Sequence, residues 1–340
     1  MSETRPLPRM IGESASFLEM QEHISRVAPL NKPVLIVGER GTGKELVAAR
    51  LHYLSTRWQQ TFLKLNCAAV SETLLEAQLF GHEAGAFTGA TRQRKGYFER
   101  ADGGTLFLDE LANTAAAVQE KILRVIEYGE FERLGGSETI NVDVRIIAAT
   151  NEDLPALASE HRFREDLLDR LAFDVITLPP LRYRSEDIPV LAEHFAVGMV
   201  KEIGGQLFAG FSPSVTKALL DYDWPGNIRE LKNVIERGVY QHGDRVVSHL
   251  VFNPFESPYR PRPGQRTSGT AAAAQTTEMV APRGEPYDFK EKVQAMEIAL
   301  LKQALEDCQF NQKRAAEHLG MTYHQLRGYL RKYELIGGDD

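Results

Sequence analysis

The sequence predicts an α/β body built on a parallel sheet, followed by a smaller helical subdomain and an all-α tail domain. Short apolar runs rich in β-branched residues occur at 33–37, 62–66, 105–108 and 144–149, and helical patterns separate them. This alternation is typical of a parallel sheet that helices cover on both faces. Residues 181–253 are mostly helical in pattern, which predicts a helical subdomain after the sheet.

A break in composition sets the expected domain boundaries. Residues 254–286 contain six prolines and three glycines without sustained apolar periodicity, which predicts a flexible linker. We therefore expect five segments: an N-terminal extension at 1–9, the α/β subdomain at 10–180, the helical subdomain at 181–253, the linker at 254–286 and the tail domain at 287–335.

Composition excludes several classes of protein. Hydrophobic residues make up 43% and charged residues 26% of the 340 residues, which excludes a mainly disordered or coiled-coil chain. No apolar run is long enough to span a bilayer, and the first residues lack the apolar region of a secretory signal. The only cysteines are Cys67 and Cys308, so we expect no disulfide framework and a protein of the reducing cytosol.

The residues that follow the first predicted strand form a phosphate-binding loop. Glycines alternate with polar residues in the order Gly38, Glu39, Arg40, Gly41, Thr42, Gly43, Lys44 and Glu45, and a helical pattern follows. Such a loop turns backbone N–H groups toward phosphates, and its lysine reaches the β- and γ-phosphates of a nucleotide such as ATP. Glu45 occupies the position where a Ser or Thr usually binds Mg²⁺. The alternative is a glycine-rich turn with a surface lysine.

Polar residues end the predicted strands at the edge where parallel sheets bind ligands. Asp109 is expected to hold Mg²⁺, and Glu110 to orient and polarise the attacking water. Thr150 and Asn151 could sense the γ-phosphate, although Thr-Asn is also ordinary turn chemistry. Asn66 is placed to hydrogen-bond Glu110. The alternative for the acidic pair is two solvated carboxylates.

Two arginines lie on a charged helical run at 163–170. Arg164 and Arg170 could supply guanidinium groups to the charge of a transition state, within one subunit or from a neighbour. The alternative is a solvated helix in which Asp166 and Arg170 pair along one face.

The segment at 85–90 carries a resemblance to a known family. Its sequence GAFTGA resembles the signature loop of the sigma-54-dependent transcriptional activators, which are AAA+ proteins. The segments GERGTGKE at 38–45, GGTLFLDE at 103–110, FREDLLDRL at 163–171 and WPGNIREL at 224–231 agree with it. In that family Glu45 is a common feature rather than a defect.

The resemblance implies the following activity and partners. It implies ATP hydrolysis with Mg²⁺, hexameric rings, and action of Arg164 and Arg170 on the neighbouring subunit's ATP. Arg229 would be the second sensor of the nucleotide state. The loop residues would contact sigma-54, and they are Gly85, Ala86, Phe87, Thr88, Gly89 and Ala90.

The chemistry of this loop suits a mobile contact. Gly85 and Gly89 permit unusual backbone angles, and we expect that no local residue covers the large apolar side chain of Phe87. As an isolated string the segment could equally be a packed turn.

Within the family, residues 28–58 resemble the activators of phage shock operons. The α/β subdomain begins almost at the N-terminus, so we expect no receiver domain and control by a separate inhibitory protein of the phage shock protein A type. Trp58, a lone tryptophan in a polar run, is the expected inhibitor contact. Packing of Trp58 onto the body, and activation of another sigma-54 operon, are the alternatives.

The sequence of the tail domain predicts a helix-turn-helix. An apolar stripe of Phe289, Val293, Met296, Leu300 and Ala304 precedes two short helical segments separated by Gly320 and a Thr322 N-cap. Gln325 and Arg327 are the expected base-reading residues. Other expected DNA contacts, to phosphate or along the outer face, are Lys313, Arg314, Thr322, His324, Arg331 and Lys332. The tail resembles the Fis-like domain of the same family and would bind enhancer DNA, although a solvated helical hairpin is the alternative.

Two other functions would explain part of the sequence. A generic AAA+ remodelling ATPase accounts for the nucleotide loop, but not for GAFTGA or the tail. A repressor that uses ATP only as a ligand predicts negligible turnover. The adenine pocket is poorly defined, with Ile11, Gly12 and Ile228 as the candidates.

Overall fold

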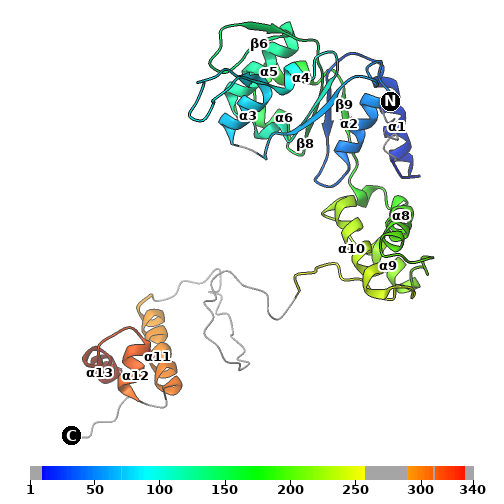
Figure 1. Ribbon diagram of the computed structural model, residues 1–340. Helices are drawn as coiled ribbons and strands as arrows, with labels where there is room; N and C mark the ends of the chain where they lie inside the picture. The colour runs from blue at the N-terminus through cyan, green and yellow to red at the C-terminus, as the bar shows by residue number, and fades with distance from the viewer. Residues whose placement is uncertain (1–9, 70, 257–288, 309–310, 334–340) are drawn as a thin grey trace. The chain divides into compact units, whose positions relative to one another are not determined.

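The computed structural model describes residues 10–69, 71–256, 289–308 and 311–333 (Figure 1). The chain divides into two compact units, residues 1–260 and 261–340. The predicted N-terminal extension and most of the predicted linker lie outside the described residues. Among the helices that are described, none is both long and apolar enough to cross a membrane.

A five-stranded parallel sheet forms the centre of the first unit, as predicted. The strands, in spatial order, are β2 (Phe62–Asn66), β5 (Thr105–Asp109), β8 (Arg145–Thr150), β1 (Val34–Val37) and β9 (Val175–Thr177). The four predicted strands are confirmed. The edge strand β9 was not predicted, because its three residues are too few for a clear periodic pattern.

Helices cover both faces of this sheet, as predicted. Successive strand side chains point to opposite faces, so Leu35 joins one apolar core while Val34 and Ile36 join the other. One face packs against α1 (Ala15–Val27) and α2 (Lys44–Tyr53). The opposite face packs against α3 (Glu72–Phe80), α4 (Tyr97–Arg100), α5 (Ala116–Tyr128), α6 (Leu154–Ser159) and α7 (Glu165–Leu171).

Two small hairpins and a 3-10 helix complete this subdomain. The strands β3 (Gly81–His82) and β4 (Arg94–Lys95) pair antiparallel, as do β6 (Glu130–Glu132) and β7 (Thr139–Asn141). The short helix η1 (Leu111–Asn113) follows β5 directly. The GAFTGA segment therefore lies in the connection between β3 and β4.

A helical subdomain follows the sheet, as predicted. Its elements are η2 (Leu181–Tyr183), α8 (Asp187–Glu202), α9 (Pro213–Asp221) and α10 (Asn227–His242), and Figure 1 shows the three α-helices gathered in one lobe. The buried Trp224 is the largest side chain of its core. The fully buried Asp187 accepts hydrogen bonds from the Glu13 and Ser14 backbone N–H groups at 2.6 and 2.8 Å, which ties α8 to the start of α1.

The second unit contains α11 (Phe289–Asp307), α12 (Gln312–His318) and α13 (Tyr323–Lys332). Leu301, Ala304 and Leu305 pack against α12 and α13. Of the predicted stripe, Ala304 is buried, whereas Leu300 is 49% exposed and its neighbour Leu301 is buried instead. The side chains of Phe289, Val293 and Met296 lie outside the described residues.

Candidate functional site

The predicted phosphate-binding loop connects β1 to the first turn of α2. Gly41 and Gly43 adopt positive φ angles of 80° and 101°, a region that favours glycine. The Lys44 ammonium donates to the backbone carbonyls of Gly38 at 2.8 Å and Glu39 at 3.3 Å, so the lysine side chain folds back over the loop. The loop therefore places a helix N-terminus and an ammonium group at one spot, which suits a polyphosphate.

The helical subdomain contacts this loop directly. A Cβ atom at Gly41 would lie 2.3 Å from the Gly226 carbonyl oxygen, so only glycine fits there. The Glu39 carboxylate accepts hydrogen bonds from Arg182 at 2.9 and 2.5 Å and from the Asn227 amide at 3.0 Å. These hydrogen bonds lower the pKa of Glu39 to about 2, so the carboxylate stays ionised.

Asp109 and Glu110 lie at the end of β5 beside this loop. Burial raises the pKa of the Asp109 carboxyl, and the nearby Lys44 ammonium opposes that shift. Burial also lowers the pKa of Lys44, against the attraction of Glu110 and Asp109. No salt bridge to Asp109 is present in the described part of the chain. A half-buried carboxylate that forms no salt bridge suits a divalent cation shared with nucleotide phosphates.

Asn151, rather than Asn66, contacts Glu110. With its amide nitrogen turned toward the carboxylate, Asn151 donates to both Glu110 oxygens, to Oε1 at 3.3 Å. The Asn66 amide oxygen instead accepts from the Ala68 backbone N–H at 2.9 Å, and the expected bond to Glu110 is not formed in this conformation. The backbone turn after β2 satisfies Asn66 locally, and this draws its side chain away from Glu110.

Three further predicted residues lie around the loop. The Thr150 hydroxyl accepts from the Glu152 backbone N–H at 2.9 Å, which is the turn chemistry named as its alternative. Glu45 pairs with Lys64 at 2.8 Å on the surface. The Arg40 guanidinium lies 3.9 Å from Glu110, and the exposed Arg229 has its Cβ 3.1 Å from the Cβ position of Gly41. Arg229 is therefore near enough to reach a ligand of the loop.

The two predicted transition-state arginines are paired with carboxylates of their own subunit. Arg164 donates to both Asp166 oxygens, at 3.0 and 2.7 Å, and reaches Glu120 at 3.4 Å. Arg170 pairs with Glu127 at 2.8 Å. The expected alternative of an Asp166–Arg170 pair is wrong, because Asp166 turns toward Arg164.

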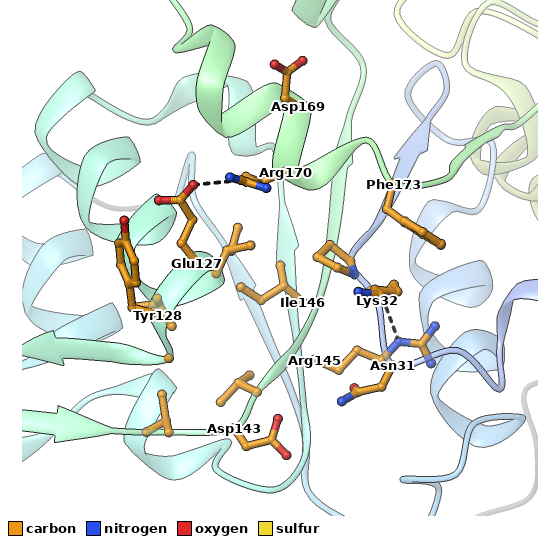
Figure 2. Close-up of a pocket in the computed structure, with 16 residues that line it drawn as sticks. Asn31, Lys32, Glu127, Tyr128, Asp143, Arg145, Ile146, Asp169, Arg170 and Phe173 are labelled. Carbon is orange, nitrogen blue, oxygen red and sulfur yellow. Dashed lines mark hydrogen bonds and ion pairs between the residues drawn. The ribbon is translucent and has the colours of Figure 1, made fainter.

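Arg170 lines a cavity of about 540 Å³ at the amino ends of β1 and β8, away from the nucleotide loop at their carboxyl ends. Figure 2 shows Arg170 paired with Glu127 on one side, while Arg145 reaches the Lys32 carbonyl on the other. The Arg145 guanidinium also donates to the Ala28 carbonyl at 2.6 Å. Arg145 is therefore held by the end of α1, whereas the more exposed Arg170 pairs with Glu127 in the described part of the chain.

The GAFTGA segment forms a loop closed by its own backbone. The Gly85 N–H donates to the Ala90 carbonyl at 2.7 Å, and the Ala90 N–H donates to the Phe87 carbonyl at 3.0 Å. Gly85 and Gly89 have φ angles of 85° and 103°. Thr88 is exposed, and Ala86 packs on Gly135 in the connection between β6 and β7.

Phe87 is partly covered, contrary to expectation. Its ring lies edge-on against His82, with 5.0 Å between ring centroids, and lines a cavity of about 340 Å³. Next to His82, at the base of the loop, Glu83 pairs with Arg133 at 2.9 Å. The loop is therefore a compact turn on a braced base, and its open side carries Thr88.

The tail unit has the geometry of a helix-turn-helix. Gly320 adopts a φ of 66° in the turn, and Thr322 caps α13 as predicted. Gln325 completes a capping box, since its Oε1 accepts from the Thr322 N–H at 2.9 Å. The exposed residues of α12, α13 and the turn include Lys313, Arg314, Thr322, His324, Gln325, Arg327, Arg331 and Lys332.

Comparison with known proteins identifies the family. Residues 10–177 match the sigma-54 interaction domain, residues 182–257 the AAA+ ATPase lid domain, and residues 292–333 the Fis family of bacterial regulatory proteins. The Psp operon transcriptional activator of Escherichia coli is 56% identical over 328 residues, which cover 96% of this chain and 98% of that protein. The chain belongs to the sigma-54-dependent transcriptional activators. The helical subdomain is accordingly an AAA+ lid.

Other relatives share the activator's core but are longer. The Nif-specific regulatory protein of Azotobacter vinelandii is 44% identical over 93% of this chain, which covers 57% of that protein. Crystal structures of NtrX from Brucella abortus with ADP and with ATP both have TM-scores of 0.66, at 32% and 31% identity. Each match covers 95% of this chain, and 68% or 69% of the NtrX chain.

The inhibitor and adenine candidates of the activator occupy different settings. Trp58 is 48% exposed in the turn after α2, beside Arg57, which is anchored to Asp143 at 2.7 Å. Ile11 and Ile228 both pack against the lid core, so they lie near the loop that carries Gly226. A Cβ at Gly12 would lie 2.6 Å from the Phe17 ring, so Gly12 is required by packing at this point.

Sequence reasoning missed three polar residues of the activator's site. Arg182 and Asn227 hold Glu39, and the buried Gln119 holds the backbone of Arg164 at 2.9 Å. No motif separates these side chains from ordinary surface or core residues. The one sequence signal for Asn227 was the turn-forming segment WPGN at 224–227. In the structure Asn227 adopts a positive φ of 52°, which is uncommon for a residue other than glycine.

Proposed function

We propose that this activator hydrolyses ATP at the β1–α2 loop and uses the energy to remodel sigma-54 RNA polymerase at a promoter. The observation that carries the proposal is the carboxylate pair Asp109 and Glu110 beside Lys44, with Asn151 oriented on Glu110. The AAA+ lid match and the nucleotide complexes of NtrX support it.

Each residue of this site has a chemical task. Lys44 and the loop N–H groups would bind the β- and γ-phosphates, and Arg229 would report their presence to the lid. Asp109 would hold Mg²⁺, which neutralises charge on the phosphates when it is bound. Glu110 would orient the water for in-line attack, while Asn151 fixes the carboxylate until the γ-phosphate is in place.

Subunits of the activator would assemble into hexameric rings. Arg164 and Arg170 lie away from their own nucleotide loop. Among the described residues, Arg164 pairs with the half-exposed Asp166, and the 60% exposed guanidinium of Arg170 pairs with Glu127. Each guanidinium could exchange that partner for the ATP of a neighbouring subunit, which is the task of an arginine finger. The site would then be complete only between two copies of the chain.

The remaining parts would deliver the motor to its promoter. The tail would bind enhancer DNA, with Arg327, His324 and Arg331 on the exposed side of α13. The GAFTGA loop would press on sigma-54 through its exposed residue Thr88. The identity with the E. coli Psp operon activator favours the phage shock operon as target.

A substitution of the water-orienting residue tests hydrolysis. We expect Glu110→Gln to retain ATP binding but to lower steady-state hydrolysis by at least about a hundredfold, because the general base is lost. The exposed Glu19→Gln on α1 is the matched control and should hydrolyse ATP normally. Equal turnover in both variants would contradict the assignment, and negligible turnover in the unmodified protein would favour the repressor function.

A separate inhibitory protein of the phage shock protein A type would control the activator through Trp58. The half-exposed indole beside the anchored Arg57 offers a rigid aromatic contact. We expect Trp58→Ala to abolish inhibition while ATP hydrolysis continues. Tyr240→Ala, which removes an exposed aromatic ring from α10, should leave inhibition intact. Unchanged binding of the inhibitor to the Trp58 variant would overturn this assignment.

A further inference from the structure

Gln119 is a buried amide that joins two segments of the proposed catalytic machinery. It lies on α5 and is 1% exposed. Its Nε2 donates to the Thr114 carbonyl at 2.7 Å, and its Oε1 accepts from the Arg164 backbone N–H at 2.9 Å. The Nε2 group also donates to the Arg162 carbonyl at 3.5 Å, so the side chain bridges the segment of Thr114 and the segment that leads into α7.

The first segment carries Glu110. Glu110 has a positive φ of 56° at the end of β5, and η1 and Thr114 follow it. The Thr114 hydroxyl donates to the Leu111 carbonyl at 2.8 Å, which closes this short turn. The hydrogen bond from Gln119 Nε2 to the Thr114 carbonyl therefore holds the turn that directly follows Glu110.

The second segment carries Arg164. Arg164 is the N-cap residue of α7, and its own side chain makes no capping bond to that helix. Among the described residues, its guanidinium pairs with two carboxylates that are at least half exposed, Asp166 and Glu120. The bond from the Arg164 N–H to Gln119 Oε1, together with the bond from Nε2 to the Arg162 carbonyl, therefore holds the backbone where α7 begins.

We propose that Gln119 is a positioning residue that sets the reach of Arg164 toward the ATP of the neighbouring subunit. The proposal rests on the proposed function of Arg164 as an arginine finger. Loss of the bond to the Arg164 N–H would let the start of α7 shift. A displacement of about 1 Å in such a group can lower turnover on the order of a hundredfold.

Three variants of the full-length chain isolate this effect. Gln119→Met keeps the side-chain length but removes the hydrogen bonds of Gln119, and we expect hydrolysis to fall on the order of a hundredfold. Val118→Ala removes buried packing from the same helix and should keep near-normal turnover. If Gln119→Met does not fold, Gln119→Leu serves instead, because it is also apolar, of similar volume and unable to accept from the Arg164 N–H.

Mixed rings distinguish positioning from a general structural role. The proposal predicts that Gln119→Met, although it also loses the bond to the Thr114 carbonyl, keeps a working Glu110 side and is defective on the Arg164 side. Glu110→Gln has the opposite defect. Mixing the two inactive proteins should restore hydrolysis to about a quarter of the unmodified level, since one interface in four combines the two intact sides. Mixing Gln119→Met with Arg164→Ala should restore nothing, because both are defective on the same side.

Two results would overturn the proposal. Full hydrolysis by Gln119→Met alone would show that Arg164 does not depend on this bond. Absence of recovery with Glu110→Gln would place the effect of Gln119 on the Glu110 side. Recovery between Arg164→Ala and Glu110→Gln is measured in parallel. If that pair also fails, Arg164 does not act between subunits, and the proposed function rather than the role of Gln119 is wrong.

Discussion

Glu39 shows how one residue of the nucleotide loop can respond to the lid. Its carboxylate is held by Arg182 and Asn227, both from the helical subdomain, and these bonds keep its pKa near 2. The Asn227 amide also donates to the Arg40 carbonyl at 3.1 Å, so the lid contacts two successive loop residues. A change in the loop conformation when phosphate binds would therefore alter these hydrogen bonds and act directly on the lid.

Removing Arg182 should affect nucleotide exchange more than folding. The Arg182–Glu39 pair is well exposed, and such pairs typically contribute less than about 1 kcal/mol to the free energy of unfolding. We expect Arg182→Ala to unfold almost normally but to release a fluorescent ATP analogue several-fold faster, because the lid loses a hold on the loop. The exposed Arg162→Ala is the control. An unchanged dissociation rate would mean that the contact is incidental.

His52 should make stability depend on pH. The imidazole is buried, stacks on Phe62 and shares a 3.0 Å hydrogen bond with Thr105, and burial lowers its pKa to about 4. The unfolded chain binds this proton near pH 6.5, so acidification between pH 6.5 and 4 favours unfolding. The corresponding loss is about 3 kcal/mol below pH 4.

Denaturant unfolding at a series of pH values measures this effect. His52→Gln, which keeps a donor for Thr105, should show a smaller decrease in unfolding free energy over that interval than the unmodified protein. Parallel pH profiles for the two proteins would exclude His52 as the titrating group.

At the scale of elements, α13 combines stability and recognition in one residue. Gln325 caps the helix through Oε1, which leaves its Nε2 group as the only donor for a base. Thr322→Ala and Gln325→Ala should each lower the unfolding free energy of the tail unit by about 1 kcal/mol, because the capping box is broken. Thermal unfolding followed by circular dichroism on the full chain would resolve this if the two units unfold separately.

Gln325→Glu separates the two roles. A glutamate at this position keeps the capping box but loses the amide donor. We expect normal tail stability and a loss of affinity that is about tenfold larger on the specific enhancer site than on random DNA. Binding measured by fluorescence anisotropy at one salt concentration gives this ratio. An equal loss on both DNAs would show that Gln325 does not read a base.

The sequence is informative for elements with a strong periodic or glycine signal. The strands that carry Asn66, Asp109 and Thr150 were predictable from apolar runs, and the phosphate-binding loop from its glycines. Side-chain partners were not predictable in this way. Asn66 satisfies its own turn while Asn151 reaches Glu110, and Phe87 finds cover on His82, because these contacts depend on tertiary geometry.

On the scale of the whole molecule, the proposed motor is distributed over copies of the chain. Asp109 and Glu110 lie at the carboxyl end of β5, whereas Arg170 lines a cavity at the amino ends of β1 and β8. Within one copy Arg170 forms an ion pair with Glu127. This arrangement predicts that hydrolysis per subunit rises steeply with protein concentration as rings form. A rate per subunit that is constant across dilution would contradict assembly as the activating step.

The central claim is that ATP hydrolysis is coupled to sigma-54 polymerase through the GAFTGA loop. Open-complex formation on a promoter with an upstream enhancer site tests it, with the unmodified protein compared with Thr88→Ala. Thr88 is exposed on a loop closed by its own backbone, so its loss should spare the fold and hydrolysis. We predict ATP-dependent opening with the unmodified protein alone, while both proteins hydrolyse ATP. Hydrolysis by both without opening by either would contradict the account and favour a different client for the motor.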